Sequence, residues 1–254
     1  MKKRFIVLIT ALQVLWGCQQ TGIGNIKPGR TTTDPSVIAN INLGVEYMRR
    51  DEFEKALDRL ERARSIDPGY FETYNMLGLL HQRLGQYRIA EENFKKALRL
   101  NGADSATMNN YGQFLCQRDR ISEATEVFQK AADNPLYETP EIAVANAGFC
   151  ALREKDLQRA EQYLRRALEL NPKFSEALLP MAQLSYDMGN YLSARGYLQR
   201  YLEVSKHTAR TLWLGIRIEK ELGDKNAVSS YSLLLLNNFP KSEEAEQLKK
   251  SSAR

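Results

Sequence analysis

Small and bulky residues recur along most of this chain with a period of about 34 residues. Six alanines mark the repeat, each about one period after the one before: Ala56, Ala90, Ala124, Ala160, Ala194 and Ala227. A small residue precedes each alanine by 12 residues: Gly44, Gly78, Gly112, Gly148, Ala182 and Gly215. A leucine or an aromatic residue follows each alanine by four: Leu60, Phe94, Phe128, Leu164, Leu198 and Tyr231. Self-similarity at this period is the sequence signature of a solenoid built from stacked helical units.

Each unit is predicted to be a pair of helices that cross closely, an A helix followed by a B helix. Glycine or alanine at the crossing lets the two backbones approach, and the bulky residue fills the groove between them. Asp67-Pro68 and Asn171-Pro172 end B helices, because the residue before proline is pushed out of the α region. The pattern resembles the tetratricopeptide repeat. It predicts an all-α superhelical solenoid of six helix-turn-helix units at 37–70, 71–104, 105–140, 141–174, 175–207 and 208–240.

Three places depart from the regular unit. Two extra residues lie between the third and fourth units, and the two prolines of segment 134–140 predict a stiff, protruding loop. Pro180 falls inside the fifth A helix, which it should kink or delay. The charged tail 241–254 is expected to form a cap helix on the last unit.

Residues 1–17 carry the features of an export signal. Three positive charges in residues 2–4 precede an apolar run of about 11 residues, Phe5–Leu15, which is too short for a bilayer span of about 20 residues. Leu15-Trp16-Gly17-Cys18 follows and resembles a bacterial lipobox, although Trp16 replaces the usual small residue. The resemblance implies lipid attachment at Cys18, which would become the mature N-terminus with several acyl chains, palmitate among them, enough for durable anchoring. Gln19 does not resemble the aspartate of an inner-membrane retention signal, so we expect the periplasmic face of the outer membrane.

Residues 18–36 are predicted to be a flexible tether, because they are rich in glycine, proline and threonine without periodicity. Without the charges of Lys2, Lys3 and Arg4, the net charge of +5 falls to +2. The remaining charges are interleaved along the helices, a pattern that does not indicate a nucleic-acid partner.

The residue types that carry catalysis are not grouped in this sequence. His81 takes a core-facing place in its unit, and His207 is expected in a loop with no nucleophile nearby. No phosphate loop, nucleophile elbow or zinc-ligand spacing occurs. We therefore expect no enzyme activity, no cofactor, no metal and no small-molecule substrate. Cys116 and Cys150 are interpreted as small core residues, with a disulfide in an oxidising compartment as the alternative.

The concave side of such a solenoid, lined by the A helices, is the predicted protein-binding groove. Asparagine recurs there at the fifth and sixth positions of the units, where its amide can pair with a peptide backbone through a donor and an acceptor. The ninth position offers side chains that could hold alternate residues of a bound segment. The candidate groove residues are Asn42, Val45, Asn75, Leu79, Asn109, Asn110, Gln113, Asn146 and Phe149. The alternative is that the asparagines bond local backbone or water and the apolar residues only complete packing.

Several stretches are similar to one family of repeat proteins. Asn109 through Leu115, Leu136-Tyr137 at the insertion, Leu214 through Ile218 and Ala227 through Tyr231 resemble the type IV pilus biogenesis and stability lipoproteins, the PilF/PilW family. Membership implies a pilotin: an outer-membrane lipoprotein that binds the pilus secretin and promotes its localisation and multimerisation, as pilus assembly and twitching motility require. The alternatives are a scaffold lipoprotein of another envelope assembly machine and a soluble periplasmic chaperone-like protein.

Overall fold

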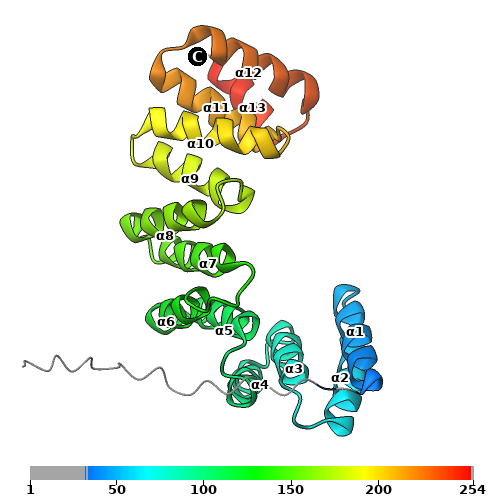
Figure 1. The fold of residues 1–254 in the computed structure, drawn as a ribbon. Helices are drawn as coiled ribbons and strands as arrows, with labels where there is room; N and C mark the ends of the chain where they lie inside the picture. The colour runs from blue at the N-terminus through cyan, green and yellow to red at the C-terminus, as the bar shows by residue number, and fades with distance from the viewer. Residues whose placement is uncertain (1–31, 33, 253–254) are drawn as a thin grey trace, which may run out of the picture.

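The computed structural model describes residues 32 and 34–252 of the chain. Within that part every regular element is a helix, so the predicted all-α fold is confirmed (Figure 1). The first 31 residues, with the predicted signal segment, Cys18 and most of the tether, lie outside the described residues. The helices are α1 Pro35–Arg49, α2 Phe53–Ile66, α3 Phe71–Arg83, α4 Tyr87–Leu100, α5 Ser105–Gln117, α6 Ile121–Ala132, α7 Pro140–Arg153, α8 Leu157–Leu170, α9 Ser175–Asp187, α10 Tyr191–Val204, α11 Ala209–Leu222, α12 Lys225–Asn238 and α13 Glu243–Ser252.

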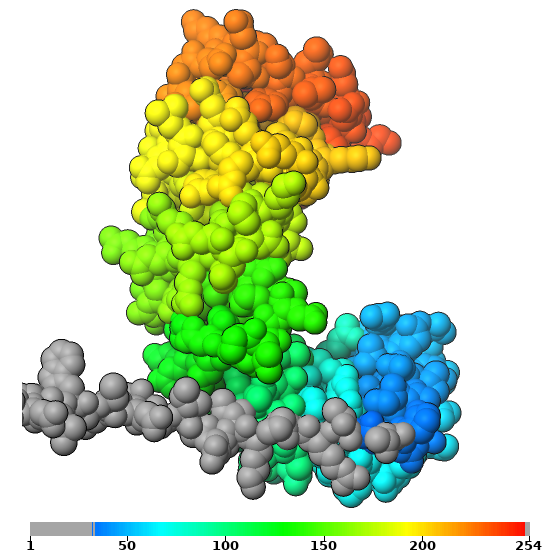
Figure 2. Space-filling model, viewed as in Figure 1, coloured from blue at the N-terminus to red at the C-terminus, as the bar shows by residue number. Residues whose placement is uncertain are grey.

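Helices α1 to α12 form six antiparallel pairs that stack in chain order, with the odd-numbered A helices on one side. The N-terminal pair lies beside the column made by the later pairs, so the molecule is a curved rod (Figures 1 and 2). Helix α1 begins two residues before the predicted first unit. Asp34 caps it by accepting a hydrogen bond from the Ser36 N–H at 2.8 Å, and Pro35 supplies a first-turn residue that has no N–H to satisfy.

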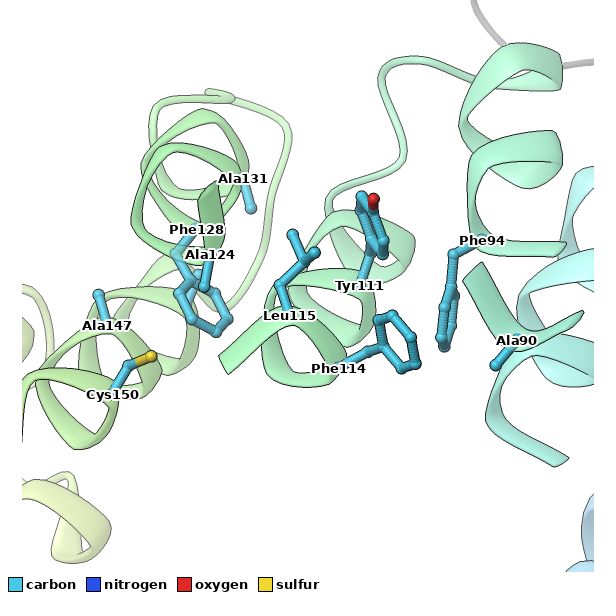
Figure 3. Close-up of a cluster of buried hydrophobic side chains, with 11 residues drawn as sticks. Ala90, Phe94, Tyr111, Phe114, Leu115, Ala124, Phe128, Ala131, Ala147 and Cys150 are labelled. Atoms are coloured by element: carbon cyan, nitrogen blue, oxygen red, sulfur yellow. The ribbon is translucent and has the colours of Figure 1, made fainter. Parts of the chain in front are cut away.

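The hydrophobic core lies between the A and B helices as a series of clusters along the stack. In the third pair and its neighbours it contains Phe94, Phe114 and Phe128, each at most 1% exposed (Figure 3). The rings of Phe94 and Phe114 lie 5.6 Å apart between centroids in a tilted arrangement. One pair alone could not bury these rings, because Phe94 comes from α4 and Phe114 from α5 of the next unit. Stacking is therefore what stabilises each unit.

The two extra residues between the third and fourth units do form a protruding loop. Leu136 is 87% exposed, and Asn134 ties the base of the loop to the preceding unit by donating hydrogen bonds to the Ala103 carbonyl and to Ser105 Oγ, both at 2.9 Å. Pro180 lies inside α9, but the prediction that it delays the helix was wrong. The helix begins at Ser175, five residues before Pro180, with Phe174 as its N-cap residue.

Cys116 and Cys150 form a disulfide, which corrects our preference for two unpaired core residues. Cys116 lies on α5 and Cys150 on α7, which are neighbouring A helices in contact. The two Cα atoms are 5.8 Å apart, within the normal range for a disulfide. The repeat register alone did not predict this pairing. The two-residue insertion puts the third and fourth units 36 residues apart, whereas the two cysteines are separated by 34, so Cys150 lies two positions earlier in its unit than Cys116 does in its own.

The tail packs as a cap helix on the last pair. Ala245 and Leu248 of α13 are buried against Leu212, Ile216 and Leu235. Without α13 these three side chains would face water at the end of the stack, which is the reason solenoids carry terminal caps.

A charged cluster joins the second unit to the third. Glu91 on α4 accepts hydrogen bonds from Lys95 at 2.7 Å, from Arg120 at 2.8 Å and from the Tyr111 hydroxyl at 3.1 Å. Burial by itself would raise the pKa of Glu91, but the hydrogen bonds from Lys95, Arg120 and Tyr111 outweigh it and lower the pKa to about 2. The ionised carboxylate therefore stabilises the stack.

Replacing Glu91 by glutamine should lower the free energy of unfolding at pH 7 by about 1 to 2 kcal/mol, less than the full pKa shift implies because the site is partly solvated. A carboxyl with a lowered folded pKa gives its full stabilisation above its unfolded pKa, near 4.5, and loses it as the pH falls through about 2. The deficit of Glu91→Gln should therefore shrink between these values in urea melts. Glu92→Gln is the control, since Glu92 is 60% exposed and pairs with Arg88 on its own helix. Equal deficits for the two variants would contradict the role given to Glu91.

Candidate protein-binding groove

The A helices line one side of the stack, and successive A helices contact each other along most of its length. At the centre of this side the asparagines pair across unit boundaries. Asn110 Nδ2 donates to Asn75 Oδ1 at 3.1 Å, and Asn146 Nδ2 donates to Asn109 Oδ1 at 2.8 Å. Two such pairs in register make a short polar ladder that runs from α3 through α5 to α7. Neither the peptide-binding nor the local-backbone interpretation anticipated bonds between the asparagines themselves.

The asparagines at the fifth position of the units are more buried than those at the sixth. Asn75 and Asn109, at the fifth position, are 3% and 7% exposed, whereas Asn110 and Asn146, at the sixth, are half-buried. A primary amide has two N–H donors and an oxygen with two lone pairs, so each asparagine at the sixth position keeps capacity for a further partner. The structure thus places Asn110 and Asn146 at the groove surface and Asn75 and Asn109 beneath them.

The ladder does not extend to either end of the stack. Asn42 is exposed on α1, but the residue at the fifth position of that unit is the buried Ile41, and the sixth position of the second unit is Met76. In the fifth and sixth units the sixth position holds Pro180 and Trp213. The ladder of paired asparagines is therefore confined to the second, third and fourth units.

Val45 and Leu79, the predicted ninth-position residues of the first two units, line one hollow. It has a volume of about 470 Å³, and Met48, Arg49, Gln82, Arg83 and Gln117 complete its lining. Gln82 Nε2 donates to Gln117 Oε1 at 2.7 Å, which joins α3 to the end of α5 on the same side. This region is referred to below as the N-terminal hollow.

Phe149, the ninth-position residue of the fourth unit, lines a second hollow of about 300 Å³ between the fourth, fifth and sixth units. Its apolar lining also includes Leu152, Leu157, Leu179, Pro180, Leu184 and Leu214, and its polar lining is Gln183, Asp187 and Arg210. This region is the C-terminal hollow. Gln113, the remaining candidate, is half-buried on α5 between the two hollows.

Sequence reasoning missed most of the apolar residues of the C-terminal hollow. Leu179 and Pro180 come from α9, and Leu214 comes from α11, so they meet only through stacking. Their spacing of about one repeat could have indicated this, but the same spacing also fits the buried core. A further hollow of about 670 Å³ lies at the C-terminal end, lined by Tyr186, Trp213 and Ile216 among others and closed by Leu248 of α13.

The two histidines are held by neighbouring side chains. His81 is 9% exposed and its Nδ1 lies 2.6 Å from Gln86 Oε1, as expected for a core-facing histidine. His207 lies edge-on to the Tyr231 ring at 5.7 Å, and burial lowers its pKa. Among the described residues, no cluster of three histidine, cysteine or acidic side chains could hold a metal ion. None of the helices in the described part has the length and apolar character needed to cross a bilayer.

Three models of the tetratricopeptide repeat match the chain, at residues 36–103, 75–139 and 151–210. The type IV pilus assembly protein PilF of Pseudomonas aeruginosa is 31% identical over 233 residues, which cover 92% of each chain. The solved structure of P. aeruginosa PilF matches with a TM-score of 0.73 and 30% identity, and it covers 85% of this chain and 97% of that one. The structure of PilW, a widely conserved type IV pilus biogenesis factor, matches with a TM-score of 0.72 and 33% identity over 85% and 99% of the two chains. These likenesses confirm the resemblance read from the sequence: the chain belongs to the tetratricopeptide-repeat family of type IV pilus biogenesis proteins that includes PilF and PilW.

Proposed function

We propose that the protein is an outer-membrane lipoprotein that binds the type IV pilus secretin and promotes its localisation and multimerisation. The observation that carries the proposal is the match to PilF over 92% of both chains, because it spans the whole repeat stack and not one motif. A role in type IV pilus biogenesis follows from family membership. The proposal adds three points to that role: the secretin is the partner, the outer membrane is the location, and twitching motility requires the protein.

The groove supports binding as the mode of action. A repeat scaffold whose relatives serve pilus assembly indicates a non-enzymatic protein, and its A helices present amides and apolar hollows over several units. Such a surface suits an extended polypeptide, which can use backbone hydrogen bonds and side-chain anchors together. In the proposed mechanism the lipid fixes the location, the groove binds secretin, and the two proteins travel together.

Two features support an envelope location. The lipobox-like Leu15-Trp16-Gly17-Cys18 follows a secretory apolar segment in the sequence. Disulfides form and persist in oxidising compartments such as the bacterial periplasm, and Cys116 and Cys150 form one. Lipidation at Cys18 would hold the stack at the periplasmic face of the outer membrane.

Deleting the gene should abolish heat-resistant secretin multimers in the outer membrane and with them twitching, and a wild-type copy should restore both. Multimers are measured by gel electrophoresis of unboiled envelope fractions. Normal multimers and normal twitching in the deletion strain would defeat the secretin proposal and favour a scaffold in another envelope assembly machine.

A Cys18→Ala copy tests the anchor separately. It should accumulate unlipidated, and secretin multimers should fall at least about tenfold, because a single uncleaved apolar segment does not replace several acyl chains. Thr21→Ala is the matched control, since it lies in the same predicted tether and leaves Leu15-Trp16-Gly17-Cys18 and the disulfide intact. Full function of an unlipidated Cys18→Ala protein would instead indicate a soluble periplasmic binding protein.

A further inference from the structure

The side of the stack lined by A helices changes character along its length. At the boundaries between units two and three and between units three and four, the fifth and sixth positions carry the asparagine pairs Asn75–Asn110 and Asn109–Asn146. At the boundaries on either side, the same two positions carry Ile41 with Met76 and Ala145 with Pro180. A polar centre is therefore flanked by apolar boundaries, although all of them occupy one register of the same repeat.

The two hollows lie between the same A helices as these apolar boundaries, but the N-terminal hollow is lined at the ninth, twelfth and thirteenth positions of the units and not by Ile41 or Met76. The N-terminal hollow has Val45, Met48 and Leu79 as its apolar lining, and the C-terminal hollow has Phe149, Leu179 and Pro180 among its own. Volumes of about 470 and 300 Å³ are large enough for one or two side chains of a partner. Each hollow can bury an apolar group, whereas the ladder between them can only form hydrogen bonds.

The N-terminal hollow is basic, whereas the charges at the C-terminal hollow balance. Arg49 and Arg83 belong to the N-terminal hollow, and none of the residues that line it is acidic. Each arginine has a carboxylate of this chain nearby: Glu46 lies 3.8 Å from Arg49 but pairs more closely with Arg50, at 2.7 Å, and Asp51 lies 3.9 Å from Arg83. Both contacts to the hollow's arginines are long and solvent-exposed, so a carboxylate of a partner can compete for them. Arg83 is held in place because it also donates to the Met48 carbonyl. The C-terminal hollow carries one acidic and one basic residue, Asp187 and Arg210.

Geometry sets the length of chain that could reach both hollows. Three repeats separate the α1–α3 boundary from the α7–α9 boundary. Packed helices lie roughly 8–10 Å apart, so the span is roughly 25–30 Å. An extended chain covers about 3.3–3.6 Å per residue, so the two anchors must lie about eight positions apart, with about seven residues between them.

We propose that the groove binds a two-anchor segment: one extended stretch with an apolar side chain near each end and an uncharged polar or small-residue centre of about seven residues. A carboxylate lies next to the anchor that enters the N-terminal hollow, where it meets Arg49 and Arg83. Asn110 and Asn146 hydrogen-bond the backbone of the centre without selecting its side chains. The inference rests on the proposed function in taking the groove as the binding surface, and it adds the chemistry of the segment that binds.

Two probes test the proposal independently of each other. The first is a phage-displayed library of random 16-residue peptides, selected on the intact folded protein. The second is an array of overlapping 20-residue peptides that covers the periplasmic sequence of the pilus secretin. Selected peptides are then synthesised, and their Kd values are measured for the wild-type protein and for three variants, Leu79→Arg, Phe149→Arg and Leu192→Arg. Leu192 is the matched control, since it is 72% exposed on the B helix α10.

The library should yield peptides with two apolar residues about eight positions apart and an acidic residue near one of them. Leu79→Arg and Phe149→Arg should each weaken binding about 10- to 100-fold, because losing one anchor removes the gain from simultaneous engagement. Leu192→Arg should leave Kd unchanged. Arg49→Glu should weaken binding about three- to tenfold, since Arg49 is 75% exposed and its nearest carboxylate is 3.8 Å away.

Changes in the peptide test the same proposal on the wild-type protein, even if a protein variant folds poorly. Serine in place of either apolar anchor should reproduce the loss for the wild-type protein, and shortening the centre by four residues should abolish the gain from the second anchor. Selected peptides with a single apolar cluster, or peptides unaffected by both Leu79→Arg and Phe149→Arg, would overturn the proposal. Two-anchor library peptides together with a secretin array that binds nowhere would support the groove chemistry while defeating the proposed partner.

Discussion

Reduction of the Cys116–Cys150 disulfide is expected to lower the free energy of unfolding by about 3 to 4 kcal/mol. The bond closes a loop with a sequence separation of 34 residues, and a cross-link of that length removes about this much chain entropy from the unfolded state. It joins α5 to α7, so the loss should fall mainly on the stacking of the third and fourth units. Urea unfolding followed by circular dichroism, with and without a phosphine reductant, measures the difference.

The double variant Cys116→Ala, Cys150→Ala is the control for this measurement. It should unfold at the same urea concentration in both conditions, close to the reduced wild-type protein, because a buried thiol behaves as a small apolar group. Cys150 is fully buried, so its free thiol would still fill its place in the core. The reduced protein should therefore still fold. If reductant leaves the wild-type midpoint unchanged while alkylation shows both thiols free, the disulfide contributes no stability.

Gly112→Ala is expected to destabilise the protein by about 2 kcal/mol, although alanine is the better helix former. A Cβ atom at this position would lie 2.6 Å from Phe128 Cε1 and 2.8 Å from Phe128 Cδ1. The Phe128 ring is 1% exposed and packed among buried side chains, so it cannot move aside without strain. Overpacking of this kind costs up to about 3 kcal/mol, and the gain in helix propensity offsets about 1 kcal/mol of it.

Gly196→Ala is the same substitution in a position without that constraint. It lies inside α10, and no atom would come within 4 Å of its Cβ. This variant should therefore gain about 1 kcal/mol, so the two alanine variants should differ by about 3 kcal/mol in urea melts. A Phe128→Leu change should partly rescue Gly112→Ala, since the fifth unit pairs Ala182 with Leu198 in the same register. Equal effects of alanine at 112 and 196 would contradict the close crossing of α5 and α6.

The sequence by itself determined the repeat and therefore the fold. The pairing of a small residue with a bulky one, as in Gly112 and Phe128, recurs at the same spacing in the other units and already required two helices to cross closely. His81 was placed correctly in the core by the same register. The start of α1 at Pro35 was not predicted, since residues 35 and 36 belong to the predicted tether, although a capping Asp34 and a first-turn proline act within one turn and were visible in the sequence.

The groove was only partly predictable, since contacts between units depend on how the units stack. The sequence placed Asn75, Asn109, Asn110 and Asn146 on the A helices, but only the tertiary structure joined them in pairs and buried two of them. It likewise brought Leu179 and Leu214 beside Phe149 to form the C-terminal hollow, and it joined Cys116 to Cys150. The physical reason is one of range: periodicity fixes which face of a helix is buried, whereas the rotation and offset between neighbouring units decide which side chains on that face meet.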